Sequence, residues 1–188
     1  MKYTLLILSA LFIGLANPAE AQERTVAGVS FPAKISAGSS LLTYNGAGLR
    51  EKFFIDLYVA ALYLKKPSMN ASAIVNADEA MAIRMEIISN KVTRDKFVQT
   101  VEDGFEKASA GKATSDDVAK LKELFSDPFS AGDMIKLAYV PGEGVVVYKN
   151  SKKLGAIGGL DFKKALFSIW LGDTPADEGL KHDMLGKV

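Results

Sequence analysis

Arg50 and Tyr58 are the two side chains whose types and spacing best suit the binding of an anion. Both belong to the stretch Asn45–Leu64, where an arginine precedes a long run of aromatic and aliphatic residues. An arginine that enters an apolar strand must reach water or meet an anion. Tyr58 follows eight residues later, and strand side chains repeat every two residues, so both project from one face unless a bulge shifts the phase.

A guanidinium and a phenol beside an apolar cleft would hold a carboxylate that carries a hydrocarbon tail. The arginine supplies charge-assisted hydrogen bonds and the tyrosine one more donor, while burial of the tail contributes about 0.8 kcal/mol per methylene. Two simpler interpretations stay open: Arg50 is an exposed residue at a strand end, and Tyr58 is an ordinary core tyrosine.

Residues for other chemistry are few. The chain has no cysteine and one histidine, His182, so neither a thiol nucleophile nor a zinc site is expected. The stretch Gly46-Ala47-Gly48 lacks the third glycine and the following helix of a dinucleotide-binding loop. A formal net charge of +1 provides no electrostatic footprint for nucleic acid. We therefore expect no metal, no cofactor and no nucleic acid, and the oligomeric state stays open.

The N-terminus has the pattern of an export signal. Lys2 forms a short positive region, residues 5–16 are apolar, and Ala19 and Ala21 are the small residues that a signal peptidase reads. About a dozen apolar residues are too few to cross roughly 30 Å of hydrocarbon. We expect a signal peptide over residues 1–21, cleavage after Ala21, a periplasmic location, and no stable membrane span in the mature chain.

Alternation and turn signals predict mainly strands in the first half of the mature chain. Pro32 favours an edge position for the first strand, and Asn45-Gly46 is a candidate turn that leads into one long strand, which can carry a bulge. The expected elements are strands over Val29–Ile35, Leu41–Tyr44, Asn45–Leu64 and Met81–Ile88, and a short helix over Ala71–Ala77.

The second half contains helices around a meander of strands. Thr93 is a candidate N-cap, and Thr114 with Asp117 resembles a capping box. The expected elements are helices from Thr93 to Gly111 and after Thr114, strands over Met134–Val140, Val145–Tyr148 and Lys153–Ile157, and helices over Asp161–Leu171 and after Thr174–Asp177. This order suits an α+β fold with an antiparallel sheet and helices on one face, formed by a single domain over residues 22–188.

Several motifs resemble those of the chalcone isomerase-like superfamily, and more narrowly those of its exported bacterial branch. They are Phe31-Pro32, the sequence Gly-Ala-Gly-Leu-Arg that ends at Arg50, the strand Ile55–Leu64, and Phe167–Gly172 before the last helix. The resemblance covers nearly all of the mature chain. It implies an open-faced β-sandwich, in which a large antiparallel sheet carries helices packed on one face, with a ligand cleft between them.

The resemblance implies two activities, which depend on different residues. In true chalcone isomerases an arginine orients the substrate, and a threonine and a tyrosine support it. Here Arg50 matches the arginine, Tyr58 takes the place of the threonine, Val92 lies near the place of the tyrosine, and Ser168 is the small hydroxyl residue near the end of the pattern. Fatty-acid-binding members instead hold the carboxylate with the arginine and the tyrosine of an Asp-x-Tyr strand, which Asp56-Leu57-Tyr58 matches.

We therefore predict a periplasmic, non-catalytic binding protein for a fatty acid or a similar amphipathic carboxylate, with Arg50, Tyr58 and Ser168 as ligand contacts. Two alternatives stay open. One is an intramolecular lyase of the chalcone isomerase type, in which the same three residues act on an unknown enone. The other is a protein-interaction module whose cleft is filled by its own side chains, with Arg50 in solvent and paired to an acidic neighbour.

Overall fold

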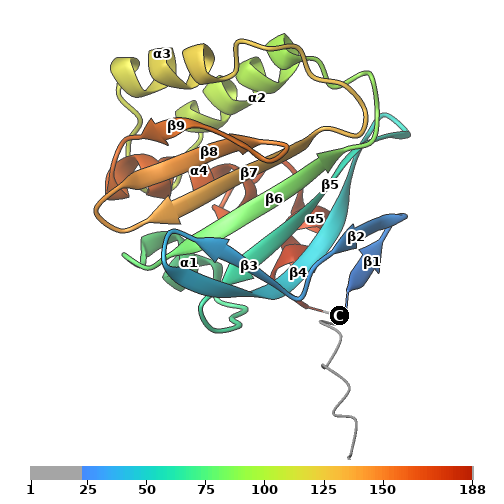
Figure 1. Ribbon diagram of the computed structural model, residues 1–188, viewed down its shortest axis with the longest axis horizontal. Helices are drawn as coiled ribbons and strands as arrows, with labels where there is room; N and C mark the ends of the chain where they lie inside the picture. Colours follow the sequence, from blue (N-terminus) through green and yellow to red (C-terminus); the bar gives the residue numbers. More distant parts are fainter. Residues whose placement is uncertain (1–22, 188) are drawn as a thin grey trace, which may run out of the picture.

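The computed structural model describes residues 23–187, so the predicted signal peptide lies outside the described residues. A seven-stranded antiparallel sheet dominates the fold, with the strands in chain order β3 to β9 (Figure 1). Its strands are β3 (Lys34–Ala37), β4 (Ser40–Lys52), β5 (Ile55–Leu64), β6 (Met81–Ile87), β7 (Met134–Val140), β8 (Gly144–Lys149) and β9 (Lys152–Ile157). A separate hairpin pairs β1 (Arg24–Val26) with β2 (Val29–Phe31).

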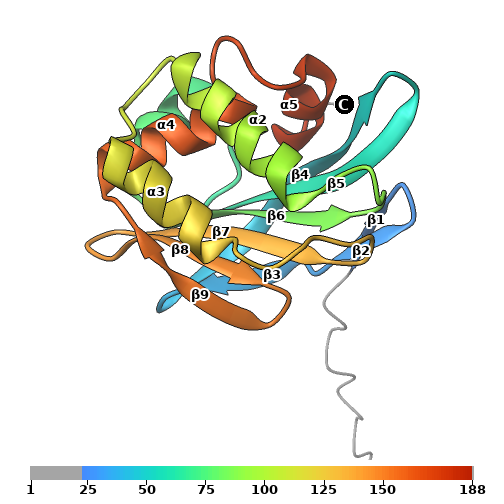
Figure 2. The ribbon, with the colours of Figure 1, turned by 90° about the horizontal axis from the view of Figure 1, so that it is seen from above.

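Five helices gather on one face of the sheet, which we call the inner face (Figure 2). They are α1 (Ala71–Asn76), α2 (Arg94–Glu106), α3 (Ser115–Leu124), α4 (Leu160–Leu171) and α5 (Glu178–Met184). The predicted N-cap at Thr93 and the capping box of Thr114 and Asp117 are both present. The expected α+β fold, with helices on one face of a large antiparallel sheet, is confirmed.

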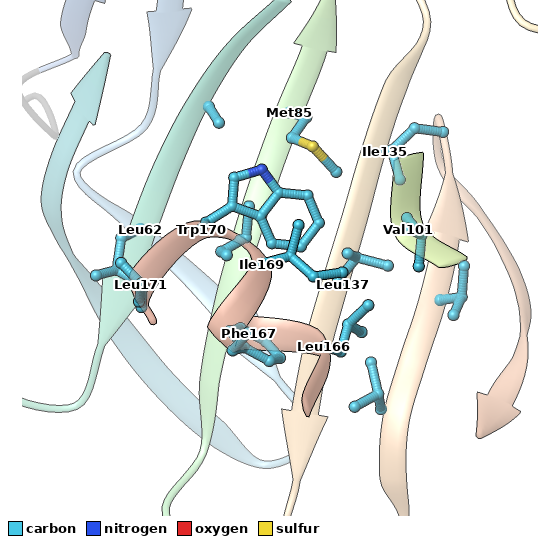
Figure 3. Close-up of a cluster of buried hydrophobic side chains, with 14 of the residues drawn as sticks. Leu62, Met85, Val101, Ile135, Leu137, Leu166, Phe167, Ile169, Trp170 and Leu171 are labelled. Atoms are coloured by element: carbon cyan, nitrogen blue, oxygen red, sulfur yellow. The ribbon is translucent and has the colours of Figure 1, made fainter. Parts of the chain in front are cut away.

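The main core lies between the sheet and α4. Nearly every residue of α4 from Phe162 to Leu171 is buried, which is typical of a helix enclosed on all sides. Figure 3 shows Phe167, Ile169 and Trp170 of α4 packed over side chains of the inner face, such as Met85 of β6. A second, smaller cluster lies on the outer face, where Phe31 covers small residues of the central strands. Among residues 23–187, no helix is both long enough and apolar enough to span a bilayer.

The expected long strand over Asn45–Leu64 is wrong, because this stretch forms most of a hairpin. Strand β4 runs through the predicted turn at Asn45-Gly46, and the chain reverses instead at Phe53-Phe54, between the paired residues Lys52 and Ile55. The predicted strand over Val29–Ile35 likewise divides into β2 and β3 around Pro32.

Contacts with α5 explain why Asn45-Gly46 is not a turn. A Cβ atom on Gly46 would lie 2.2 Å from the backbone oxygen of Asp183, and one on Gly48 would lie 2.7 Å from the Cβ of Asp183. The side-chain amide Nδ2 of Asn45 donates to the backbone oxygen of Met184 at 2.9 Å. These residues therefore permit the close approach of α5, while a bulge between Tyr44 and Gly46 keeps Leu49 on the outer face and Arg50 on the inner one.

Candidate functional site

A cavity of about 480 Å³ opens between the end of the β4–β5 hairpin, α2 and α4. Its volume lies within the range typical of small-molecule sites. Apolar and aromatic side chains supply most of the wall, and several charged side chains join them. The lining residues are Arg50, Lys52, Phe53, Ile55, Leu57, Tyr58, Lys91, Val92, Lys96, Phe97, Gln99, Thr100, Val101, Asp103, Ile169 and Trp170.

Arg50 and Tyr58 are direct cross-strand partners in the β4–β5 pair. Residues opposite each other in an antiparallel pair project from the same face, with Cβ atoms about 5 Å apart. That face is the inner one, because Tyr58 belongs to the core beneath the helices. The two side chains therefore share a face, as expected, but they do so across a hairpin and not along a single strand.

The phenol of Tyr58 lines the cavity and contacts Trp170. The indole Nε1 of Trp170 donates to the Tyr58 oxygen at 3.1 Å. An indole can only donate, so the hydroxyl hydrogen of Tyr58 stays free for another acceptor. Burial raises the pKa of Tyr58, which the Trp170 hydrogen bond and the Arg50 charge partly oppose. The phenol is therefore protonated at neutral pH and can donate to an anion.

Arg50 already has one carboxylate partner. Its Nη1 donates to Oδ2 of Asp177 at 2.6 Å and to the backbone oxygen of Glu51 at 2.7 Å. The side chains of Arg50 and Asp177 are only 16% and 23% exposed. Both of these hydrogen bonds use Nη1, and Arg50 also lies close enough to the Tyr58 hydroxyl to favour the ionised phenol. Within residues 23–187, Nε and Nη2 of Arg50 therefore have no carboxylate partner, and an entering anion can bind them without displacing Asp177.

Asp177 has a second role as the N-cap of α5. Its Oδ1 accepts from the backbone N–H of Leu180 at 2.8 Å, while Oδ2 binds Arg50. One carboxylate thus joins the start of α5 to the end of β4. Sequence reasoning identified Asp177 only as the start of a helix, because nothing in the local pattern indicates a partner more than a hundred residues away.

The charge of the cavity wall is predominantly positive. Three lysines, Lys52, Lys91 and Lys96, line it together with Arg50, whereas Asp103 is the single acidic residue in the lining. A concave, mostly apolar site with this excess of cations favours an anionic ligand. Sequence analysis did not identify these lysines, since each belongs to a different local segment and looks like an ordinary exposed residue.

Ser168, also predicted as a ligand contact, lies outside this cavity. Its hydroxyl donates to the backbone oxygen of Lys164 at 2.7 Å, one turn earlier in α4. Residues two apart on a helix point in directions roughly 200° apart, so Ser168 and Trp170 cannot face the same space. His182 is exposed beside Asp183. In the part of the chain that the structure describes, no group of three His, Cys, Asp or Glu side chains could hold a metal ion.

Comparisons with known proteins agree with this architecture. A family model described as chalcone isomerase-like matches residues 23–186. Among solved structures, the chain is similar to the crystal structure of a fatty-acid binding protein from Arabidopsis thaliana, with 23% sequence identity and a TM-score of 0.68. That match covers 84% of this chain and 92% of the plant chain. A comparison with curated proteins finds no match.

Proposed function

The chain belongs to the chalcone isomerase-like family, and we propose that it is an exported, non-catalytic binding protein for a fatty acid or a similar amphipathic carboxylate. The observation that carries this proposal is the cross-strand pair of Arg50 and Tyr58 on the wall of a largely apolar cavity of about 480 Å³. The name of the plant structure, a fatty-acid binding protein with the same fold, supports it as well.

The ligand's headgroup would lie between the free donors of the pair. A carboxylate has two oxygens, of which one would accept from Nε or Nη2 of Arg50 and the other from the hydroxyl of Tyr58. Charge-assisted hydrogen bonds of this kind are about twice as strong as neutral ones. The hydrocarbon tail would lie against Val101, Phe97 and Ile169, which α2 and α4 contribute to the wall.

The proposal of binding without catalysis rests on the residue near the start of α2. The family resemblance implies a catalytic tyrosine close to Val92, and Val92 lines the cavity with a side chain that can neither donate nor accept a hydrogen bond. Tyr58 is the only tyrosine in the cavity wall that the structure describes. An isomerase of this family would support the reacting ketone with that tyrosine, and the hydrogen-bond donors of the wall near Val92 are Lys91 and Lys96, neither of which is a phenol.

Trp170 provides a direct assay, because it is the only tryptophan of the chain and lines the cavity. We expect saturated fatty acids of increasing chain length to change its emission, with affinity rising until the cavity is full. Arg50→Gln should weaken binding by about tenfold to a hundredfold, and Tyr58→Phe by about tenfold. The corresponding methyl esters, which lack the charge, should bind as weakly to wild type as the acids bind to Arg50→Gln.

Matched control variants separate the contribution of Arg50 and Tyr58 to ligand binding from general effects of substitution. Arg24→Gln removes an exposed arginine of β1, and Tyr148→Phe removes a hydroxyl on the outer face, so both should bind like wild type. Equal affinity in wild type, Arg50→Gln and Tyr58→Phe would refute the proposed headgroup site. Cyclisation of a chalcone or another enone above the buffer rate, lost in Arg50→Gln, would instead favour the intramolecular lyase.

The export part of the proposal depends on residues outside the described region. Lys2, the apolar run over residues 5–16 and the small residues Ala19 and Ala21 support it. N-terminal sequencing of the protein from a periplasmic extract should begin at Gln22. Recovery of the uncleaved chain in the membrane fraction would show instead that the apolar run anchors it.

A further inference from the structure

Two phenylalanines form the tip of the β4–β5 hairpin, and both are fully presented to solvent. Phe53 is 83% exposed and Phe54 is 98% exposed. The hairpin end, coloured turquoise, projects beyond the helices and the rest of the sheet in Figure 1 and Figure 2. Phe53 also belongs to the cavity wall, so whatever contacts the tip lies at the entrance of the proposed binding site.

The turn itself does not explain these residue types. Phe53 and Phe54 have φ values of 52° and 59°, the left-handed region that a two-residue type I′ turn requires. Asn-Gly is the preferred sequence there, and a bulky residue with positive φ is strained. Aromatic side chains that are neither buried nor suited to their backbone conformation indicate that the tip contacts another molecule.

Charge is divided between the two sides of the tip. Lys52 and Ile55 form the last cross-strand pair, and both line the cavity together with the exposed Lys91 and Lys96. Glu51 and Asp56 form the next pair and alternate to the opposite side, away from the cavity. The cavity side of the tip is therefore basic, and the acidic side faces away from it.

We propose that Phe53 and Phe54 insert into the interfacial region of an anionic phospholipid bilayer, with the cavity-side lysines on the headgroups. Aromatic residues favour this interface, and basic residues near an anionic surface add to the binding. A protein partner would need about 800 Å² of buried surface per side, which two side chains on an isolated convex tip do not offer. The docked cavity mouth would open toward the lipid, the natural source of amphipathic carboxylates.

Cosedimentation with lipid vesicles tests this docking in the absence of any added fatty acid. The mature protein should bind vesicles of phosphatidylcholine and phosphatidylglycerol, and bind pure phosphatidylcholine vesicles more weakly. Phe54→Gly should lower the vesicle partition coefficient by about tenfold or more. Lys52→Gln should lower it on the anionic vesicles only, and added salt should have the same effect.

A control variant and a light-scattering measurement distinguish membrane docking from other effects of the exposed tip. Leu41→Thr removes another exposed apolar side chain, 59% exposed and at the far end of β4, and should bind vesicles like wild type. Unchanged vesicle binding by Phe54→Gly, or no binding of wild type to anionic vesicles, overturns the proposal. So does a wild-type dimer in light scattering that Phe54→Gly converts to a monomer, because the tip would then join two copies. Trp170 fluorescence tests the fatty-acid site separately, so either proposal can fail alone.

Discussion

Nη1 of Arg50 lies 2.6 Å from Oδ2 of Asp177, a residue that also caps the first turn of α5. The proposed headgroup site therefore contains a carboxylate of its own before any ligand enters. This resident anion compensates part of the arginine's charge in a half-buried position. It also limits the affinity for a second carboxylate, because two like charges near one guanidinium repel each other.

Removal of the Asp177 charge should strengthen ligand binding. Asn is about as good an N-cap as Asp, so Asp177→Asn keeps the cap of α5 and loses the repulsion. We expect the fatty-acid affinity measured by Trp170 fluorescence to rise about tenfold. Asp177→Ala is the control for the cap, and should lower the free energy of unfolding by about 1 kcal/mol. Weaker binding by Asp177→Asn would show that Asp177 mainly holds Arg50 in position.

The strained turn at the hairpin tip should be easy to stabilise. Phe53→Asn with Phe54→Gly installs the preferred type I′ sequence and removes two bulky residues from the left-handed region. We expect the free energy of unfolding in urea to increase by about 1–2 kcal/mol, while vesicle binding falls. A loss of stability would mean that the two rings make contacts that hold the hairpin. The opposite directions of stability and docking distinguish a functional tip from a structural one.

A side chain at Gly46 should separate α5 from the sheet. The added Cβ atom would lie 2.2 Å from one backbone oxygen of α5 and 2.8 Å from another, so the helix must move. Gly46→Ala should lower the free energy of unfolding by about 2–3 kcal/mol, and amide exchange over residues 178–184 should accelerate. Gly179→Ala, within α5 itself, gains helix propensity but places a Cβ atom 3.2 Å from Oδ1 of Asp177, so the two effects should roughly cancel. Wild-type stability in Gly46→Ala would contradict the close packing of β4 against α5.

Stability should fall in alkaline solution because of buried tyrosines. Burial raises the pKa of Tyr58 and Tyr63, and burial together with the hydrogen bond to Asp78 raises the pKa of Tyr139 to about 12. The unfolded chain releases these protons near pH 10, before the folded protein does. Between about pH 10 and 12 the unfolded state therefore binds fewer protons, and the free energy of unfolding decreases as pH rises.

Urea unfolding at several pH values, followed with tyrosinate absorbance, measures this effect. Tyr139→Phe removes one of the three groups and should reduce the slope of stability against pH in this window. Tyr148→Phe, which removes a hydroxyl on the outer face, is the matched variant against which the change in slope is compared. Ionisation of all tyrosines in the folded protein near pH 10 would contradict the burial of Tyr58, Tyr63 and Tyr139.

Local sequence signals determined much of the secondary structure. The N-cap at Thr93 and the capping box at Thr114 were predictable because a cap involves residues only three positions apart. The order of strands and helices indicated an antiparallel sheet with helices on one face, and the motif residues indicated the family. The period of two along a strand also predicted that Arg50 and Tyr58 share a face. They do share one, but as cross-strand partners in a hairpin and not as residues of one strand.

Only the tertiary structure decided where the hairpin turns and what surrounds the pair. Gly46 was predicted as a turn residue. Its position requires glycine for another reason, because α5, more than a hundred residues later, packs directly against its backbone. Asp177 and Trp170, which contact Arg50 and Tyr58, also lie more than a hundred residues away along the chain. A single sequence shows which contacts each residue could make with its neighbours. The packing of remote segments selects which contacts form, and no local spacing encodes that choice.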